Sequence, residues 1–256
     1  MYHQFKELAD VDITREPMEI GPTCHYAMGG VEVDPDSQAS VVPGLFAAGE
    51  VAGGMHGANR LGGNSLSDLI VFGKRAGDYA AAYVKELGPA RPKAVPADVA
   101  GAAEDALTPF KAGPAQENPY AIHQELQETM QDLVGIIRVE HELKEALQKI
   151  AELRARGANV SVEGNRQYNP GWHLALDLRN MLLVSEAVAT AALEREESRG
   201  GHTRDDYPMT DPYWGTQNVV VALAAPSSGA GGGLSFRRQP LPKPPPELAE
   251  LLEDVH

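Results

Sequence analysis

The sequence predicts an α/β fold over residues 1–87, then a three-helix bundle over residues 118–200 and an irregular tail over residues 201–256. Residues 21–64 are rich in glycine and are typical of short strands and turns, while residues 65–87 have a strongly helical pattern. Three amphipathic helical patterns with short connections follow, and this arrangement is typical of a small antiparallel bundle.

The α/β segment is expected to contain a buried strand and a buried helix. The run Gly44–Gly49 is a short apolar stretch bounded by glycines, as in buried strands. Ser65 and Asp68 have the spacing of a capping box, which predicts a helix start. Apolar residues cover nearly all sides of this helix and predict its burial. Gly73 and Gly77 lie one turn apart and suggest close approach of another backbone or a ligand, because glycine otherwise weakens a helix.

The linker and the bundle are distinguished by composition. Residues 88–117 are rich in proline and alanine and predict a linker with a short helix at about 96–110. Dense charge and helical periodicity run from Pro119 to about Arg156, and a third helix is expected from about Gly171 to Glu197. The apolar positions that carry the period in the first two helical segments are Leu126, Met130, Leu133 and Ile137, then Leu143, Leu147, Ile150 and Leu153.

The tail is predicted to contain one short strand, at Asn218–Leu223. A flexible linker is expected at Ser227–Gly233, because glycine and serine dominate it. The Pro-rich segment Lys243–Pro246 is expected to lead into a short acidic helix.

Composition and charge exclude several classes of function. Lys and Arg number 22 against 36 for Asp and Glu, a net charge of −14, which argues against a nucleic-acid partner.

The single cysteine, Cys24, excludes a disulfide framework and fits a reducing compartment. The longest aliphatic run, Val219–Ala225, is far shorter than the roughly 20 residues that span a bilayer. Met1–Phe5 lacks the basic and apolar regions of a signal peptide.

Three polar residues in the glycine-rich segment are candidates for chemistry. Arg60 lies in a glycine-rich loop before a predicted helix start, where its planar fork and the free N–H groups could hold an anion. Glu50 follows the predicted strand and could accept hydrogen bonds from ligand hydroxyls, although a helix cap or a solvated acid is at least as good a reading. His25 precedes a Gly-Gly turn, and on this segment alone a structural histidine is the better interpretation.

The stretch from His25 to Gly77, HYAMGGVEVDPDSQASVVPGLFAAGEVAGGMHGANRLGGNSLSDLIVFGKRAG, resembles the flavoprotein subunits of succinate dehydrogenase and fumarate reductase. Glu197–Pro208 resembles the segment that follows the helical bundle in the same family. Residues 1–87 would then be the C-terminal part of an FAD-binding domain, incomplete in this chain. The resemblance extends over most of the chain except residues 222–256.

The resemblance implies a role for several residues. His25 and Arg60 match the family residues that bind substrate carboxylates, and Glu50 matches the acid that contacts the FAD ribityl region. Asn64, Ser65 and Leu66 match the helix start that faces the flavin, where the dipole would stabilise negative charge. The implied reaction is hydride transfer between FAD and succinate or fumarate.

The resemblance also implies parts that this sequence does not contain. No Gly-x-Gly-x-x-Gly turn follows a strand here, and the family's proton-donating arginine belongs to a region before residue 1. We therefore expect no proton donor and no metal site in the chain, and no activity without an N-terminal half. Two alternatives stay open: a fragment similar to L-aspartate oxidase, or a non-catalytic chain of the complex. The double glycine after Arg60-Leu61 favours the dicarboxylate dehydrogenases.

Partners and location are also implied by the resemblance. The expected partners are a dicarboxylate substrate, the N-terminal half of the FAD domain, a membrane anchor and an iron–sulfur subunit. The expected location is cytoplasmic, on the inner face of the cell membrane through partner subunits.

Overall fold

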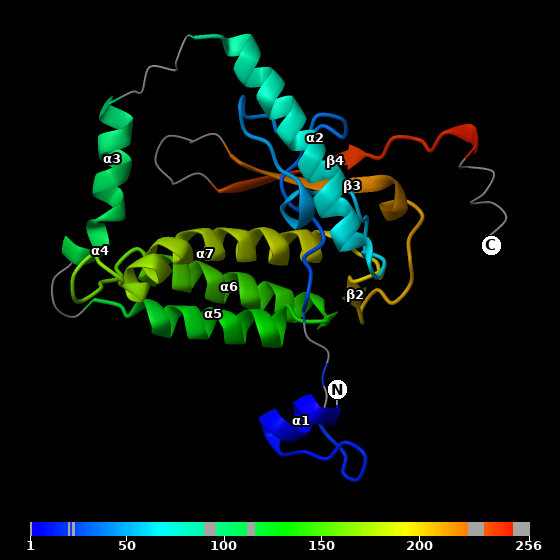
Figure 1. The fold of residues 1–256 in the computed structure, drawn as a ribbon. Coiled ribbons are helices and arrows are strands. Elements are labelled where there is room, and N and C mark those ends of the chain that lie inside the picture. Colours follow the sequence, from blue (N-terminus) through cyan, green and yellow to red (C-terminus); the bar gives the residue numbers. More distant parts are fainter. Residues whose placement is uncertain are drawn as a thin grey trace.

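The computed structural model describes residues 2–19, 21, 24–89, 96–111, 116–224 and 233–247. In these residues no helix is long and apolar enough to cross a membrane. The fold mixes helices and strands (Figure 1). The helices are α1 (Tyr2–Ala9), α2 (Asn64–Leu87), α3 (Pro96–Ala106), α4 (Thr108–Lys111), α5 (Pro119–Leu133), α6 (Glu140–Gly157) and α7 (Pro170–Glu194), and the strands are β1 (Ile137–Arg138), β2 (Thr203–Arg204), β3 (Gln217–Leu223) and β4 (Leu234–Pro240).

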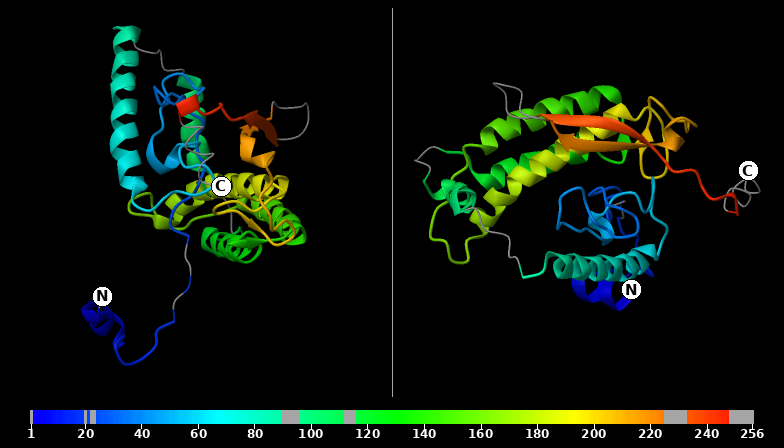
Figure 2. Two further views of the ribbon diagram at one scale, coloured as in Figure 1. Left: turned by 90° about the vertical axis from the view of Figure 1, so that its right-hand side faces the viewer. Right: turned by 90° about the horizontal axis from the view of Figure 1, so that it is seen from above.

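The main hydrophobic core lies between α5, α6 and α7, which run side by side in all views (Figures 1 and 2). Asn118 and Asn169 cap α5 and α7, because each side-chain oxygen accepts a hydrogen bond from a backbone N–H of the first turn. Proline follows each cap at the first helical position. The fully buried core side chains include Ile122, Leu143, Ile150 and Leu178.

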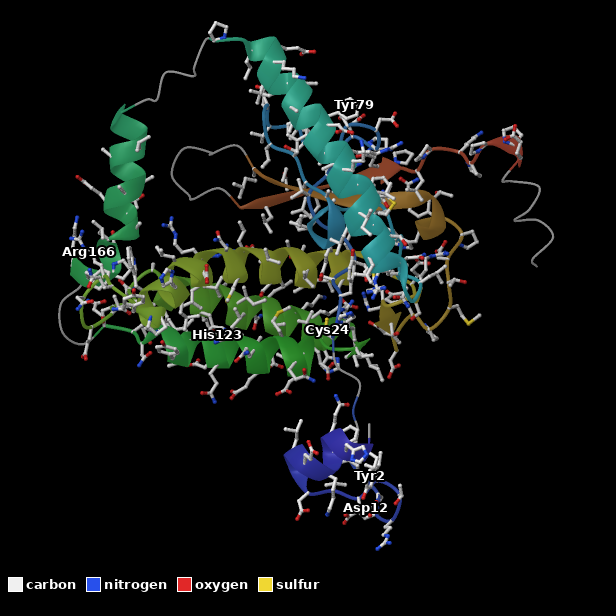
Figure 3. The ribbon with its side chains drawn as sticks, in the orientation of Figure 1. Tyr2, Asp12, Cys24, Tyr79, His123 and Arg166 are labelled. Atoms are coloured by element: carbon white, nitrogen blue, oxygen red, sulfur yellow. The ribbon has the colours of Figure 1, made fainter. Side chains whose placement is uncertain are left out.

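Helix α2 starts differently from the prediction and is more exposed than predicted. Its N-cap is Gly63, with φ +82° and no side-chain cap, so the predicted capping box at Ser65 is wrong. Leu66 and Ile70 are 67% and 73% exposed, so the predicted burial is also wrong for the described chain. No described segment packs over this face; Tyr79, which is 47% exposed, lies further along the same helix (Figure 3).

The predicted buried strand Gly44–Gly49 is wrong. This segment makes a single bridge, between Phe46 and Ala39, and Leu45 is half exposed. Gly44 and Gly49 both have positive φ, so the chain turns at each end and no ladder can extend. Across the described part of residues 1–87 the α/β expectation therefore reduces to isolated bridges around one long helix.

Close backbone approach organises the glycine-rich segment. Val31 N–H donates to Val51 O at 2.7 Å, and Gly53 N–H donates back to Val31 O at 2.9 Å. A Cβ on Gly30 would lie 2.1 Å from Val51 O, so only glycine permits this approach. The segment that contains His25 is thereby fixed against the residues that follow Glu50.

The tail is less irregular than predicted. The strand predicted at Asn218–Leu223 is confirmed as β3, but the antiparallel partner β4 was missed. The sequence of β4, LSFRRQP, contains two arginines and ends in proline, so it lacks a clear strand signal. Most of the predicted linker Ser227–Gly233 lies outside the described residues, as does most of the acidic helix after Pro246. Arg237 Nη2 donates to both carboxylate oxygens of Glu32 at 2.8 Å and ties the hairpin to the glycine-rich segment.

Candidate functional site

Arg60 lies in the glycine-rich loop before α2, as the sequence predicts. Its guanidinium carbon is 4.6 Å from the centre of the Tyr26 ring, and its Nη1 donates to Leu61 O at 3.2 Å. Its Nε atom is buried and has no hydrogen-bond partner in the described chain. No described carboxylate forms an ion pair with Arg60. The guanidinium is therefore held in place while most of its donors stay available for an anionic ligand.

A buried carboxylate lies behind Tyr26. Asp68, on α2, is 5% exposed, and its Oδ2 atom lies 3.2 Å from the Tyr26 hydroxyl and 3.1 Å from His56 Nε2. The pKa of Tyr26 is raised, first by burial and then by the charge of Asp68 and its hydrogen bond, so the phenol stays neutral. Sequence reasoning missed Tyr26 and assigned Asp68 to a helix cap. Ser65 and Asp68 do have the spacing of a capping box, but this local pattern cannot predict that Asp68 contacts Tyr26 and His56.

Glu50 lies in a short 3₁₀ helix, Gly49–Val51, rather than after a strand. Its side chain is exposed, and one carboxylate oxygen accepts a hydrogen bond from Ala27 N–H at 2.9 Å. This contact holds the backbone two residues after His25. The His25 side chain is exposed, and its ring makes no hydrogen bond within the described part of the chain.

Asn64, Ser65 and Leu66 form the first turn of α2. The first-turn N–H groups have no side-chain cap, and a Cβ on Gly62 or Gly63 would meet nothing within 4 Å. An uncapped helix start with open space before it can accept a polar or anionic group. The predicted residues of this turn are therefore together, exposed or half-exposed, and next to the Arg60 loop.

The Arg60 loop also contacts the region after the bundle. Gly201 N–H donates to Ala58 O at 2.8 Å, and Gly200 has φ +59°. A Cβ on Gly200 would lie 2.6 Å from Ala58 O. This turn, Arg199–His202, therefore links the end of the bundle to the loop that positions Arg60.

Beyond this turn, charged side chains are buried and paired. Arg204 is 1% exposed, donates to Ala192 O at 2.9 Å, and forms two 2.7 Å bonds with Asp206. These hydrogen bonds from Arg204 lower the pKa of Asp206 to about 2. Burial lowers the pKa of His202, whose ring lies 2.8 Å from Arg138 Nη1 and 3.0 Å from Arg195 O. The arrangement stabilises the C-terminus of α7, where cations are favoured.

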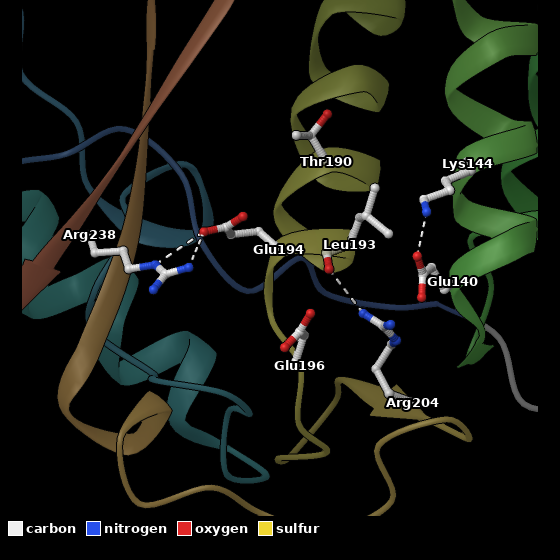
Figure 4. A pocket seen from close by; sticks show the side chains of 8 residues that line it. All are labelled: Glu140, Lys144, Thr190, Leu193, Glu194, Glu196, Arg204 and Arg238. Carbon is white, nitrogen blue, oxygen red and sulfur yellow. Dashed lines mark hydrogen bonds and ion pairs between the residues drawn. The ribbon is translucent and has the colours of Figure 1, made fainter.

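A pocket of about 280 Å³ lies next to this network (Figure 4). All three cationic side chains that line it already have partners: Lys144 pairs with Glu140, Arg238 pairs with Glu194, and Arg204 donates to backbone carbonyls of α7. None of the candidate site residues lines it, so we do not assign it to the candidate site. The lining residues are Glu140, Lys144, Thr190, Leu193, Glu194, Glu196, Arg204 and Arg238.

Two family models match the chain. One, described as an FAD binding domain, matches residues 1–66. The other, described as the C-terminal part of fumarate reductase flavoprotein, matches residues 123–229. The first lies over the Arg60 loop and the start of α2, and the second over the helical core and the Gly200 turn.

Individual relatives agree with these matches. One chain of the CoM/CoB fumarate reductase of Methanothermobacter marburgensis is 40% identical over 84% of this chain and 38% of that protein. The succinate dehydrogenase flavoprotein subunit of Coxiella burnetii is 38% identical over 80% of this chain and 37% of that protein. Sdh1 of Mycobacterium smegmatis, solved in complex with UQ1, superimposes with a TM-score of 0.90 at 58% identity, over 98% of this chain and 42% of that chain. The chain thus spans about two fifths of the length of these relatives.

Proposed function

Because the chain belongs to the succinate dehydrogenase and fumarate reductase flavoprotein family, we propose that it forms the substrate-binding wall of an FAD-dependent dicarboxylate oxidoreductase. The proposed reaction is the interconversion of succinate and fumarate by the whole flavoprotein. We assign no proton donor to residues of this chain.

The observation that carries this proposal is the state of Arg60. A half-buried guanidinium that stacks on Tyr26, has an unpartnered buried Nε and forms no ion pair with a described carboxylate is ready to bind an anion. A carboxylate matches the fork of donors on arginine in a bidentate geometry. We propose that Arg60 binds one carboxylate of the substrate, and that His25 donates a hydrogen bond to a substrate carboxylate.

The helix start fits one edge of a flavin. Asn64 N–H donates to Leu61 O at 3.2 Å, while no side chain caps the first-turn N–H groups, and a Cβ on Gly62 or Gly63 would meet nothing within 4 Å. The positive end of the α2 dipole would stabilise negative charge there by about 0.3–1 kcal/mol. Glu50 is proposed to contact the ribityl region. When bound, FAD would supply the hydride acceptor or donor, while the chain orients the substrate and the ring.

Domain division and partners are part of the proposal. We propose that residues 1–87 belong to the FAD domain, 88–117 to a linker, 118–200 to a three-helix bundle and 201–256 to a tail. The bundle assignment is supported by the shared core of α5, α6 and α7. The proposed partners are a membrane anchor and an iron–sulfur subunit, and the proposed location is peripheral, on the cytoplasmic face of the membrane.

The test uses a hybrid enzyme, in which this chain replaces the matching stretch of the Mycobacterium smegmatis flavoprotein. In this hybrid, Arg60→Ala should reduce kcat/KM for succinate by at least about a hundredfold, because a charge-assisted pair to the substrate is lost. Flavin content, read from visible absorbance, should not change. Arg75→Ala is the matched control, because Arg75 is an exposed arginine on α2.

Each outcome separates the candidate functions. Succinate turnover near the level of the unsubstituted hybrid in Arg60→Ala would remove Arg60 from the mechanism. Oxidation of L-aspartate in place of succinate by the hybrid would favour the aspartate oxidase alternative. A hybrid that binds FAD but oxidises neither compound would favour a non-catalytic role.

A further inference from the structure

We propose that Asp68 is a positioning residue, which holds Arg60 through Tyr26 in the orientation that receives a substrate carboxylate. This inference rests on the proposed function of Arg60. It assigns a role to a buried acid that makes no direct contact with Arg60.

The first step concerns the burial of Asp68. Its side chain is 4% exposed, and a carboxylate in such a place is tolerated only when it is hydrogen-bonded. An ionised carboxylate can only accept hydrogen bonds, so the Tyr26 hydroxyl and His56 Nε2 must both donate to its Oδ2 atom. Asp68 therefore fixes both the hydroxyl of Tyr26 and the tautomer of His56.

The second step follows from the orientation of the Tyr26 ring. The hydroxyl is held by Asp68 at one end, and the ring packs edge-to-face against His56, with 5.5 Å between centroids. The ring face then lies 4.6 Å from the guanidinium carbon of Arg60. A cation over an aromatic face is stabilised by the ring quadrupole, so a fixed ring defines where the guanidinium rests.

The third step explains why a neutral ring lies between the two charges. A direct ion pair between Asp68 and Arg60 would occupy the donors that a substrate carboxylate needs. Because Asp68 fixes the Tyr26 ring and the ring contacts the guanidinium, Asp68 positions Arg60 without occupying its hydrogen-bond donors. The raised pKa of Tyr26 keeps the phenol protonated, as this arrangement requires.

The network also has a defined place in the fold. Asp68 lies on α2, Tyr26 is adjacent to His25, and His56 and Arg60 lie in one glycine-rich loop. One carboxylate therefore connects three segments that each carry a candidate substrate or cofactor residue. Loss of Asp68 should loosen the orientation of Arg60 without removing any group that touches the substrate.

The experiment measures ligand binding in the FAD-loaded hybrid enzyme defined above. The probe is malonate, a dicarboxylate with no CH–CH bond to oxidise, and its Kd is measured by isothermal titration calorimetry. We expect Asp68→Asn to raise this Kd about tenfold, because hydrogen bonds to a charged group are lost. Tyr26→Phe, which keeps the ring but removes the hydroxyl, should raise it a few-fold. Asp78→Asn, an exposed acid on the same helix, is the control and should leave it unchanged.

A double-mutant cycle distinguishes positioning from general loosening of the fold. If Asp68 acts through Arg60, Asp68→Asn should add nothing to the effect of Arg60→Ala on the malonate Kd. Additive effects, or an unchanged Kd in both Asp68→Asn and Tyr26→Phe, would overturn the inference. If Asp68→Asn does not fold, Tyr26→Phe alone decides, with flavin content and melting temperature as folding checks. If Arg60→Ala leaves malonate binding intact, the proposed function itself fails.

Discussion

At the C-terminus of α7, Arg204 and Asp206 form a partly buried ion pair. The Arg204 side chain is almost completely buried, and three backbone carbonyls of α7 and its C-cap accept hydrogen bonds from it, while Asp206 balances its charge. A buried arginine without such partners would strongly destabilise the fold. Arg204 is therefore a cationic cap on the C-terminus of α7, where a positive charge is favoured.

The depressed pKa of Asp206 predicts a pH dependence of stability. Its folded pKa of about 2 lies below the ordinary value of 3.8. The carboxylate therefore contributes stability that is present above about pH 4 and is lost as pH falls toward 2. Because this side chain is 27% exposed, solvent screening limits the contribution to about 1–2 kcal/mol.

Unfolding free energies from urea titrations between pH 7 and pH 2 check this prediction. Asp206→Asn should be less stable than the unsubstituted chain at pH 6, and the difference should shrink as the pH approaches 2. A difference that stays constant over this range would contradict it. Asp177→Asn on α7 serves as the control.

At the scale of elements, sequence patterns located helices better than strands. Helices α5, α6 and α7 and strand β3 were predicted correctly, because the pattern that indicates each of them depends only on residues a few positions apart. The strand at Gly44–Gly49 failed because positive φ at both glycines is a backbone property that an apolar run does not reveal. The partner strand β4 was missed because its pairing with β3 is set by tertiary context.

The residues of the candidate site also fall into two groups, those that a local sequence pattern predicts and those that it does not. Arg60 and the start of α2 could be found from a local pattern of glycine, arginine and helix signals. Tyr26 and Asp68 could not, because 42 residues separate the two members of that hydrogen bond. Contacts across such distances depend on how α2 is placed against the preceding loops.

The contact between the Gly200 turn and the Arg60 loop gives a prediction at this scale. Gly200→Ala should displace Ala58, since a Cβ would lie 2.6 Å from its carbonyl oxygen. We expect amide hydrogen exchange in residues 57–61 to rise by about tenfold or more, as the loop is released from the bundle. Gly73→Ala, where a Cβ meets nothing within 4 Å, is the control and should leave that exchange unchanged. Unchanged exchange in Gly200→Ala would show that the turn does not hold the loop.

For the whole molecule, the exposed apolar face of α2 stands out. Leu66, Leu69 and Ile70 lie three and four residues apart, so they share one side of the helix, and all three are more than half exposed. Contiguous apolar surface of this kind marks a contact region. In the relatives this chain corresponds to only about two fifths of the protein.

The same face predicts the behaviour of the purified chain. We expect it to bind the dye ANS and to self-associate with increasing concentration, because apolar surface is favourable to remove from water. Ile70→Lys should reduce both effects, measured by ANS fluorescence and sedimentation velocity. Val99→Lys on α3, also an exposed position, should have little effect. Equal effects of both substitutions would argue against α2 as the contact region.

The ion pair between Arg237 and Glu32 has a consequence for the order of folding. These residues are 205 positions apart, and closing a loop of that length costs roughly 5 kcal/mol of chain entropy. An exposed ion pair contributes at most about 1 kcal/mol, which is too little to offset the entropy cost of bringing Glu32 and Arg237 together. The pair can form only after the helices and the glycine-rich segment have folded and brought the hairpin alongside. It therefore belongs to the last step of folding and to the first step of unfolding.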